Sequence, residues 1–289
     1  MPPRLALRAR LAAALVAAGA IGLAGCPHPA DTPTPAHRGG RQAVPKPEPA
    51  FTGPQAAPVR QAPTDRWEPL VDGLAWRRWE LGGEAPAALL AVQADPALLA
   101  IEVVPLHTRA PGERTAAELV ANGAALAAVN GGFFVLDKQG AKQPLGLLMH
   151  AGKRSSDLRR ADWGIFLIAQ GKPRIIHCRD PLPAGTTEAL QCGPRLLIDG
   201  RSPSFKAAAA TRRSAIGMDD SGRVVLAATE SGALTLPQLA GALRSLGCRW
   251  ALNLDGGPST QLSLRAGDVQ TDIPGLWAVP SAIRVRTRR

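Results

Sequence analysis

One carboxylate in this 289-residue sequence stands where a side chain can reach a bound ligand. Asp255 follows a short apolar run, residues 250–252, and precedes the pair Gly256-Gly257, with the hydroxyls of Ser259 and Thr260 just beyond. Because glycine has no side chain and permits positive φ, a backbone of this kind can approach a ligand closely. Asp-Gly followed by Ser and Thr is also ordinary turn chemistry at the end of a strand. These residues alone therefore leave a site and a turn as alternatives.

A second stretch, earlier in the chain, has the same construction. The capping-box signature Thr-Ala-Ala-Glu at 115–118 predicts the start of a helix, and the apolar run 124–129 ends in Asn130-Gly131-Gly132. The order repeats later, with the capping box 235–238, leucines at helical spacing, and a strand that ends in Asn253. We expect two helix-strand units, each ending in an Asn and a Gly-Gly turn. If their strands share one sheet, both turns lie at its carboxyl edge, where open α/β sheets bind ligands.

Five motifs occur in a fixed order along the chain: Asn130-Gly131-Gly132-Phe133-Phe134, Pro144-Leu145-Gly146-Leu147, the segment 193–200, the segment 213–217, and Leu254-Asp255-Gly256-Gly257-Pro258-Ser259-Thr260. This series resembles the phosphodiester glycosidase family, and the similarity spans roughly residues 70–286. The two glycine motifs are specific as a pair. Where relatives often carry a third glycine, this chain has Pro258, which stiffens the turn without removing the carboxylate.

The resemblance implies hydrolysis of a sugar from a phosphodiester. The leaving phosphate is already a stabilised anion, so the reaction needs a strong general acid less than ordinary glycoside hydrolysis does. It needs a carboxylate near the anomeric carbon, and Asp255 is the candidate, as nucleophile or as base for water. It also needs a cation on the phosphate. Arg213 is the candidate clamp because a guanidinium can bind two oxygens at once, with Arg212 and Arg195 as alternatives.

The remaining candidates surround the carboxylate. Asn130 and Asn253 would orient the sugar or the attacking water, while the backbones of Gly131, Gly132, Gly256 and Gly257 make room and offer N–H groups. Ser259 and Thr260 complete the expected substrate-binding set. The alternatives are a surface salt bridge for Arg213 and a purely structural turn role for Asn130.

The N-terminus predicts a bacterial lipoprotein. Three arginines precede the apolar stretch 11–23, and Leu23-Ala24-Gly25-Cys26 is typical of a lipobox, with Cys26 as the lipidated residue. An uncleaved anchor helix is the alternative. We therefore expect a signal peptide over 1–26, a Pro/Ala-rich disordered tether over 27–66 and a phosphodiester glycosidase-like domain over 67–289. The expected location is the cell envelope, membrane-anchored through lipid and facing the periplasm or exterior.

The domain reads as α+β, with a mixed β-sheet and few helices. Only the two capped helices are indicated, whereas short apolar runs predict many strands. These lie at 87–92, 99–104, 145–149, 163–168, 174–177, 215–218, 224–227, 250–254, 261–264 and 281–285.

The formal net charge of +11 does not indicate nucleic-acid binding. Several arginines fall in the signal peptide, the tether and the C-terminal tail, and no helix-turn-helix, zinc-finger or aromatic RNA-binding motif is present. The expected partner is a carbohydrate or sugar-phosphate substrate.

Cysteine and histidine placement gives two further expectations. Cys178 and Cys192 flank a loop with prolines and are the expected disulfide, whereas Cys248 precedes a buried strand and is expected in the core. The histidines show no metal-ligand spacing, so we expect no metal and no cofactor, with Ca²⁺ at Asp255 as the alternative. Two functions follow: an envelope hydrolase of sugar-1-phosphodiesters in cell-wall or exopolysaccharide metabolism, or a non-catalytic carbohydrate-binding lipoprotein that uses the same site.

Overall fold

A computed structural model describes residues 61–107, 115–206 and 208–288. The predicted signal peptide with Cys26, and residues 27–60 of the predicted tether, lie outside the described residues. Strands dominate the described part, and it contains two α-helices, α1 (Ala116–Ala121) and α2 (Leu236–Ser245). No helix in this part is both long and apolar enough to cross a membrane.

Three larger sheets and one hairpin contain the strands. The seven-stranded sheet holds, in spatial order, β1 (Glu68–Val71), β2 (Leu74–Leu81), β3 (Ala87–Ala94), β15 (Val224–Ser231), β14 (Ser214–Met218), β16 (Trp250–Asn253) and β13 (Arg195–Leu197). The second sheet holds β18 (Val269–Ile273), β17 (Leu262–Ala266), β5 (Ala127–Asn130), β19 (Ser281–Thr287) and β4 (Leu99–Pro105). The third holds β11 (Lys172–His177), β10 (Gly164–Ala169), β12 (Thr186–Cys192), β8 (Leu148–His150) and β9 (Lys153–Ser156). The hairpin is β6 (Phe134–Leu136) with β7 (Lys142–Pro144).

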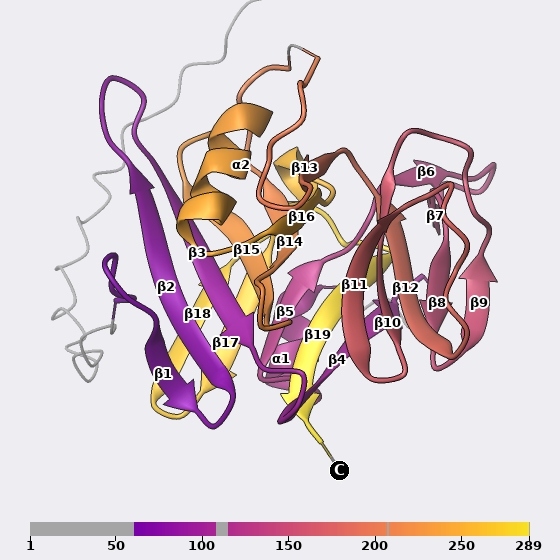
Figure 1. Cartoon of the computed structure of the whole chain (residues 1–289), viewed down its shortest axis with the longest axis horizontal. Coiled ribbons are helices and arrows are strands. Elements are labelled where there is room, and N and C mark those ends of the chain that lie inside the picture. The colour runs from indigo at the N-terminus through magenta and orange to yellow at the C-terminus, as the bar shows by residue number, and fades with distance from the viewer. Residues whose placement is uncertain (1–60, 108–114, 207, 289) are drawn as a thin grey trace, which may run out of the picture. The chain divides into compact units, whose positions relative to one another are not determined.

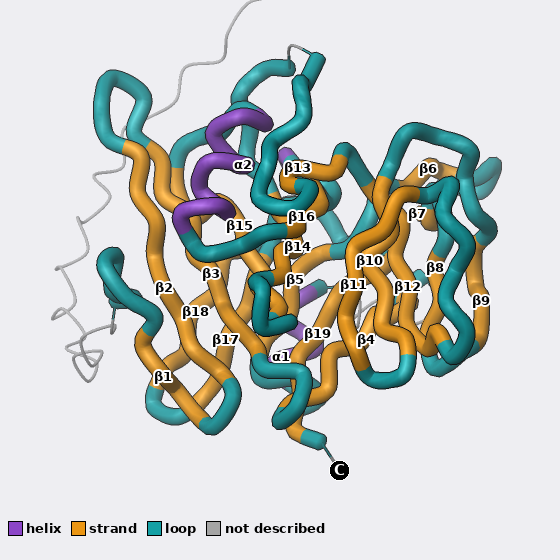
Figure 2. Tube along the Cα trace, in the orientation of Figure 1, coloured by secondary structure: helices purple, strands orange, loops and turns teal. Residues whose placement is uncertain are grey.

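The sheets lie side by side (Figures 1 and 2), and all three contribute side chains to one apolar cluster. Strand β3 shows how, because side chains alternate between the two faces of a strand. Leu89 and Ala91 pack with the apolar face of α2, whereas Leu90 and Val92 pack in a cluster with Val129 of the second sheet. Helix α1 packs on the outer face of the second sheet, and the third sheet contributes further side chains to the same central cluster. The order of layers is therefore helix, sheet, sheet, helix, with the third sheet alongside.

Both predicted capping boxes are present. Thr115 Oγ1 accepts from the N–H of Glu118 at 3.2 Å, and Glu118 Oε2 accepts from the N–H of Thr115 at 2.8 Å. Thr235 and Gln238 make the same reciprocal pair at the start of α2. Gly247, with φ of +92°, follows the last turn of α2, where a left-handed residue ends a helix without steric cost.

The predicted sheet type needs correction. Each predicted strand overlaps an observed one, but the paired strands of the described residues are antiparallel, so the sheet is not mixed. The two helix-strand units also end in different sheets, with β5 in the second and β16 in the seven-stranded sheet. Sequence patterns missed strands such as β2 and β9, because polar residues interrupt their apolar alternation.

The expected disulfide also needs correction, since Cys178 and Cys192 are free thiols. Gly164 of β10 pairs with His177 on one side and with Cys192 on the other. The two cysteines thus flank a central strand, and strands two positions apart are about 9.5 Å from each other. A disulfide tolerates a Cα separation of only about 7 Å. The Cys178 thiol instead donates to Ala161 O at 2.6 Å, and Cys248 packs beside α2.

Candidate active site

The ends of β5 and β16 meet although they belong to different sheets. The N–H of Asp255 donates to Gly131 O at 3.1 Å, and Asn130 Nδ2 donates to Asp255 O at 2.7 Å. These two bonds join the turn after β5 to the turn after β16. The residues predicted from the two glycine motifs are thereby brought together around Asp255.

Both polar atoms of the Asn130 side chain make hydrogen bonds at this junction. It is fully buried, and its amide N–H groups donate to Asp255 O and, at 3.3 Å, to Gly131 O. Its Oδ1 accepts from Ser214 Oγ at 2.6 Å and from the N–H of Gln261 at 3.1 Å. Two donors and two acceptor lone pairs are all the hydrogen-bonding capacity an Asn side chain has. Asn130 therefore positions Asp255 and has no group left for a sugar or a water.

The other polar residues of the second glycine motif are buried as well. Asn253 Nδ2 donates to Gly193 O at 2.9 Å and to Leu254 O at 2.8 Å. Asn253 Oδ1, Ser259 Oγ and Thr260 Oγ1 are covered by protein and have no regular hydrogen-bond partner. Unsatisfied buried oxygens in one short segment mark a place where a bound water or a small rotation completes the network.

The glycines are required by packing. A Cβ on Gly131 would lie 2.3 Å from Ser281 Oγ, and one on Gly132 would lie 2.9 Å from Gln191 O. On Gly256 it would lie 2.8 Å from Arg212 O, and Gly257 has a φ of +58°. The N–H groups of Gly131, Gly256 and Gly257 donate to Ser281 O, Asp255 Oδ1 and Arg212 O. These three N–H groups thus hold the junction, and the expectation that they face a ligand is not met.

The Asp255 carboxylate is partly buried, and this burial raises its pKa above the usual value. Three nearby groups oppose the rise: the Ser259 hydroxyl, which lies close without a hydrogen bond of regular geometry, the N–H of Gly256 at 3.0 Å, and the positive charge of Lys142. A carboxyl group whose pKa is raised by its surroundings is typical of an acid–base or nucleophilic residue.

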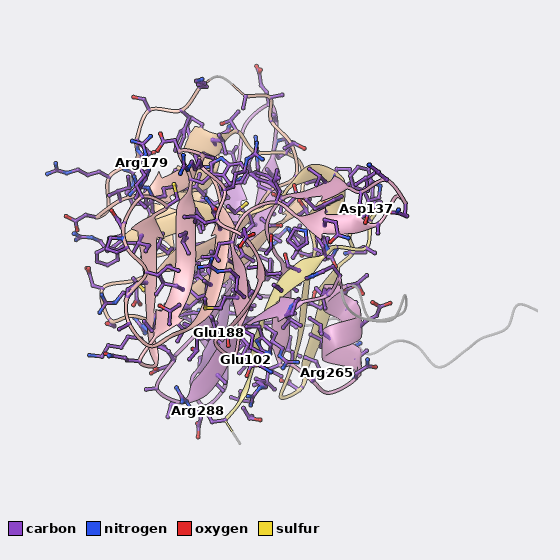
Figure 3. All side chains as sticks on the ribbon, turned by 90° about the vertical axis from the view of Figure 1, so that its right-hand side faces the viewer. Glu102, Asp137, Arg179, Glu188, Arg265 and Arg288 are labelled. Carbon is purple, nitrogen blue, oxygen red and sulfur yellow. The ribbon has the colours of Figure 1, made fainter. Side chains whose placement is uncertain are left out.

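Lys142 is the site residue that sequence reasoning missed. Its Nζ donates to Ala278 O at 2.6 Å and lies 4.9 Å from the Phe134 ring centroid and 5.2 Å from that of Trp277. These distances are typical of cation–π contacts. Lys142 lies on β7 of the hairpin, whose turn carries Asp137 (Figure 3). No motif surrounds it, and its only sequence signal is that β6 begins at Phe134, inside the first glycine motif.

The candidate arginines do not converge on Asp255. Ser214 faces Asn130, and neighbouring residues of an extended chain point to opposite sides, so Arg213 points away from the junction. Arg213 Nε donates to Leu234 O at 3.0 Å and its Nη2 donates to Ala209 O at 2.9 Å. Arg212 Nη2 donates to Pro274 O at 3.1 Å. Arg195 begins β13. The hydrogen bond to His177 is the main cause that lowers the pKa of Asp162, and the charges of His177, Arg179 and Arg195 add to it.

Among the described residues, no three His, Cys, Asp or Glu side chains are grouped as a metal site would require. The alternative of Ca²⁺ at Asp255 stays a prediction.

Comparison with known proteins gives a family match over the segment that contains these residues. Residues 123–286 match the model of the phosphodiester glycosidase family, which is more than half of the chain. The match contains both glycine motifs, the hairpin with Lys142 and all three candidate arginines. No curated protein sequence is significantly similar to this chain.

Solved structures show the same fold. The catalytic domain of zebrafish N-acetylglucosamine-1-phosphodiester alpha-N-acetylglucosaminidase, auto-inhibited by its pro-peptide, has 19% identity and a TM-score of 0.57, with 79% of this chain and 87% of that one covered. A hypothetical protein from Synechocystis has 19% identity and a TM-score of 0.53, covering 81% of this chain and 64% of that one. A protein from Burkholderia pseudomallei, whose name proposes that it is exported, has 14% identity and a TM-score of 0.53, covering 70% and 74%.

The junction yields a stability prediction. Asn130→Asp keeps the shape but removes both donors to Asp255 O and Gly131 O, and it buries a charge. We expect the free energy of unfolding, measured by urea denaturation, to fall by about 3 kcal/mol or more. Ser214→Ala removes one bond of the same network and should cost about 1 kcal/mol. An Asn130→Asp protein as stable as the parent would show that the junction is not held by this amide.

Proposed function

Because this chain belongs to the phosphodiester glycosidase family, we propose that it hydrolyses the bond between a sugar and the phosphate of a phosphodiester. The observation that carries the proposal is the partly buried Asp255. Asn130 fixes it where two sheets meet, and its carboxylate interacts with the positive charge of Lys142. The name of the zebrafish relative describes action on a sugar-1-phosphodiester. We assign the same bond class to this chain.

Asp255 acts in its ionised form, either by bonding to the anomeric carbon or by accepting the proton of the attacking water. The phosphate leaves as a stabilised anion, so no strong general acid is needed. Lys142 favours the ionised state of Asp255 and attracts the negative charge that grows on the departing phosphate. In this proposal Lys142 takes the place first considered for Arg213, whose guanidinium holds the carbonyls of Leu234 and Ala209 instead.

The hairpin side of the site offers an apolar face for a sugar ring. Trp277 is half exposed, and its ring lies 6.4 Å from that of Phe134 in an edge-on arrangement. Lys142 contacts both rings, so the aromatic pair and the cation form one surface. Ligand sites combine such aromatic walls with a few fixed polar groups.

Asp255→Asn tests the reaction. The amide is nearly isosteric with the acid but can neither attack carbon nor accept a proton, so turnover of a sugar-1-phosphodiester should fall by several orders of magnitude with substrate binding largely kept. The melting temperature should not fall, because the variant removes a partly buried charge. Activity of the parent should survive EDTA, since no step here uses a metal.

Near-parental turnover by purified Asp255→Asn would refute the catalytic role. If the parent binds glycans tightly yet cleaves no member of a broad panel of sugar-1-phosphodiesters, the non-catalytic carbohydrate-binding function replaces the hydrolase.

Lys142→Met tests the electrostatic role through pH. Burial holds the pKa of Asp255 above its usual value while Lys142 pulls it down, so removal of the ammonium raises it further. The acid limb of kcat/KM against pH should therefore move to higher pH, and the maximum should fall by about 10-fold or more. Lys153→Met, which removes an exposed lysine from β9, should leave the profile unchanged. An unmoved acid limb in Lys142→Met would contradict the assignment.

We also propose that the protein acts in the bacterial cell envelope, lipid-anchored at Cys26, on cell-wall or exopolysaccharide material. The support is the lipobox at 23–26 with its apolar and basic leader, and the exported character proposed in the name of the Burkholderia relative.

Cys26→Ser tests the anchor. Without the thiol no lipid can be attached, so the protein should leave the membrane fraction or accumulate as precursor, and labelling with a fatty-acid analogue should be lost. Label that persists in the variant would exclude Cys26 as the attachment point.

A further inference from the structure

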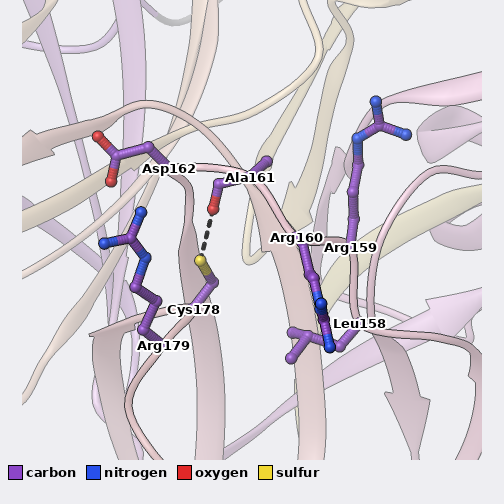
Figure 4. Close-up of a pocket in the computed structure, with 7 residues that line it drawn as sticks. All are labelled: Leu158, Arg159, Arg160, Ala161, Asp162, Cys178 and Arg179. Atoms are coloured by element: carbon purple, nitrogen blue, oxygen red, sulfur yellow. Dashed lines mark hydrogen bonds between the residues drawn. The ribbon is translucent and has the colours of Figure 1, made fainter. Parts of the chain in front are cut away.

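Three arginines line a cavity of about 560 Å³ beside the third sheet. Arg159 and Arg160 come from the loop between β9 and β10, and Arg179 follows β11 (Figure 4). Their guanidinium groups are exposed and make no hydrogen bond or ion pair with the described residues. Asp162 is the one acid of this lining, and it already pairs with His177, with 2.7 Å between Oδ1 and Nε2. The pocket therefore carries an excess of positive charge.

The arginine loop is fixed at two points. Gln191 Nε2 donates to Arg159 O at 2.8 Å, and Gln191 Oε1 accepts from the N–H of Arg159 at 2.9 Å. The Cys178 thiol holds Ala161 O two residues further on. Gln191 is itself buried, with only 2% of its surface exposed. A backbone held in this way presents its side chains at low entropic cost, which favours ligand binding.

A chain of aromatic contacts runs from the arginine pocket toward the candidate active site. Arg159 lies 5.7 Å from the centroid of the Trp163 ring, and that ring lies 5.2 Å from the ring of Phe133. Phe133 belongs to the first glycine motif, two residues after the Gly131 carbonyl that binds Asp255. The backbone of Gln191 also contacts this motif, because a Cβ on Gly132 would lie only 2.9 Å from Gln191 O. The Trp163–Phe133 ring pair thus lies between the arginine pocket and the first glycine motif.

We propose that the arginine pocket binds a second phosphate of the substrate, carried by the group that leaves with the scissile phosphate. Arginine forks match phosphate oxygens in pairs, and the cavity is large enough for a phosphate with part of the polyol or sugar that bears it. The preferred substrate is therefore an anionic chain with repeated phosphodiester links. This inference rests on the proposed function and specifies its substrate class.

Binding of a phosphate monoester tests the pocket without any cleavage. Calorimetry should detect glycerol 1-phosphate but neither glycerol nor the carboxylate glucuronate. Arg159→Gln and Arg179→Gln should each weaken binding by about 10-fold or more, the usual loss for a charge-assisted bond. Asp162→Asn removes the competing negative charge and should tighten it. Arg265→Gln is the matched control, because this exposed arginine on β17 lies far from Arg179 (Figure 3).

Kinetics then test the substrate class. Two sugar-1-phosphodiesters that differ only in a second phosphate on the leaving group should differ about 10-fold or more in kcat/KM with the parent enzyme, and much less with Arg159→Gln or Arg179→Gln. Arg265→Gln should keep the parental ratio.

The failures of the two proposals are distinguishable. Phosphate binding, or a kcat/KM ratio, that is unchanged in both arginine variants overturns the inference while leaving hydrolysis and its loss in Asp255→Asn untouched. Glucuronate that binds as well as glycerol 1-phosphate overturns the choice of phosphate. Phosphate binding that the arginine variants lose supports the pocket even if the parent cleaves nothing, a result that contradicts the proposed function alone.

Discussion

The contact between the Asn130 amide and the carbonyl of Asp255 is the constraint around which the molecule is arranged. Strands β5 and β16 belong to separate sheets, so no ladder of hydrogen bonds fixes one relative to the other. One buried side chain instead joins both turns to Ser214 of β14 and to the start of β17. The glycines are required beside this contact, because Ser281, Gln191 and Arg212 approach Gly131, Gly132 and Gly256 too closely for a side chain.

The same junction holds the Asp255 carboxylate in a partly buried position, where ionisation is unfavourable. Burial raises the pKa of Asp255, so the folded protein binds its proton more tightly than the unfolded chain does. Stability from this group is therefore complete at pH values below the unfolded pKa and is lost as pH rises through the folded one. At pH values above the folded-state pKa the ionised residue opposes folding, and the surrounding network must offset it. Such a conflict between local stability and placement is expected at a functional site.

Local signals in the sequence predicted local structure well. The capping boxes at Thr115 and Thr235 depend on residues three positions apart, and the structure contains both at their predicted places. Contacts between distant segments could not be read in this way. The prediction of a Cys178–Cys192 disulfide is wrong because β10 separates the strands that carry the two cysteines. The side chain of Arg213 does not point toward Asp255, because strand alternation directs it toward Leu234 O. Lys142 carries no motif, and only the folded chain brings it near Asp255.

Gln191 fixes the path of the arginine loop without contacting the side chains of the loop. It grips the arginine loop only through backbone atoms of Arg159, while the side chains of that loop project outward into the cavity. Substitutions at 158–160 can therefore change the charge of the cavity while the loop keeps its path and the junction its geometry. If the arginine pocket binds the leaving group as proposed, such substitutions would change the preferred leaving group without moving Asp255.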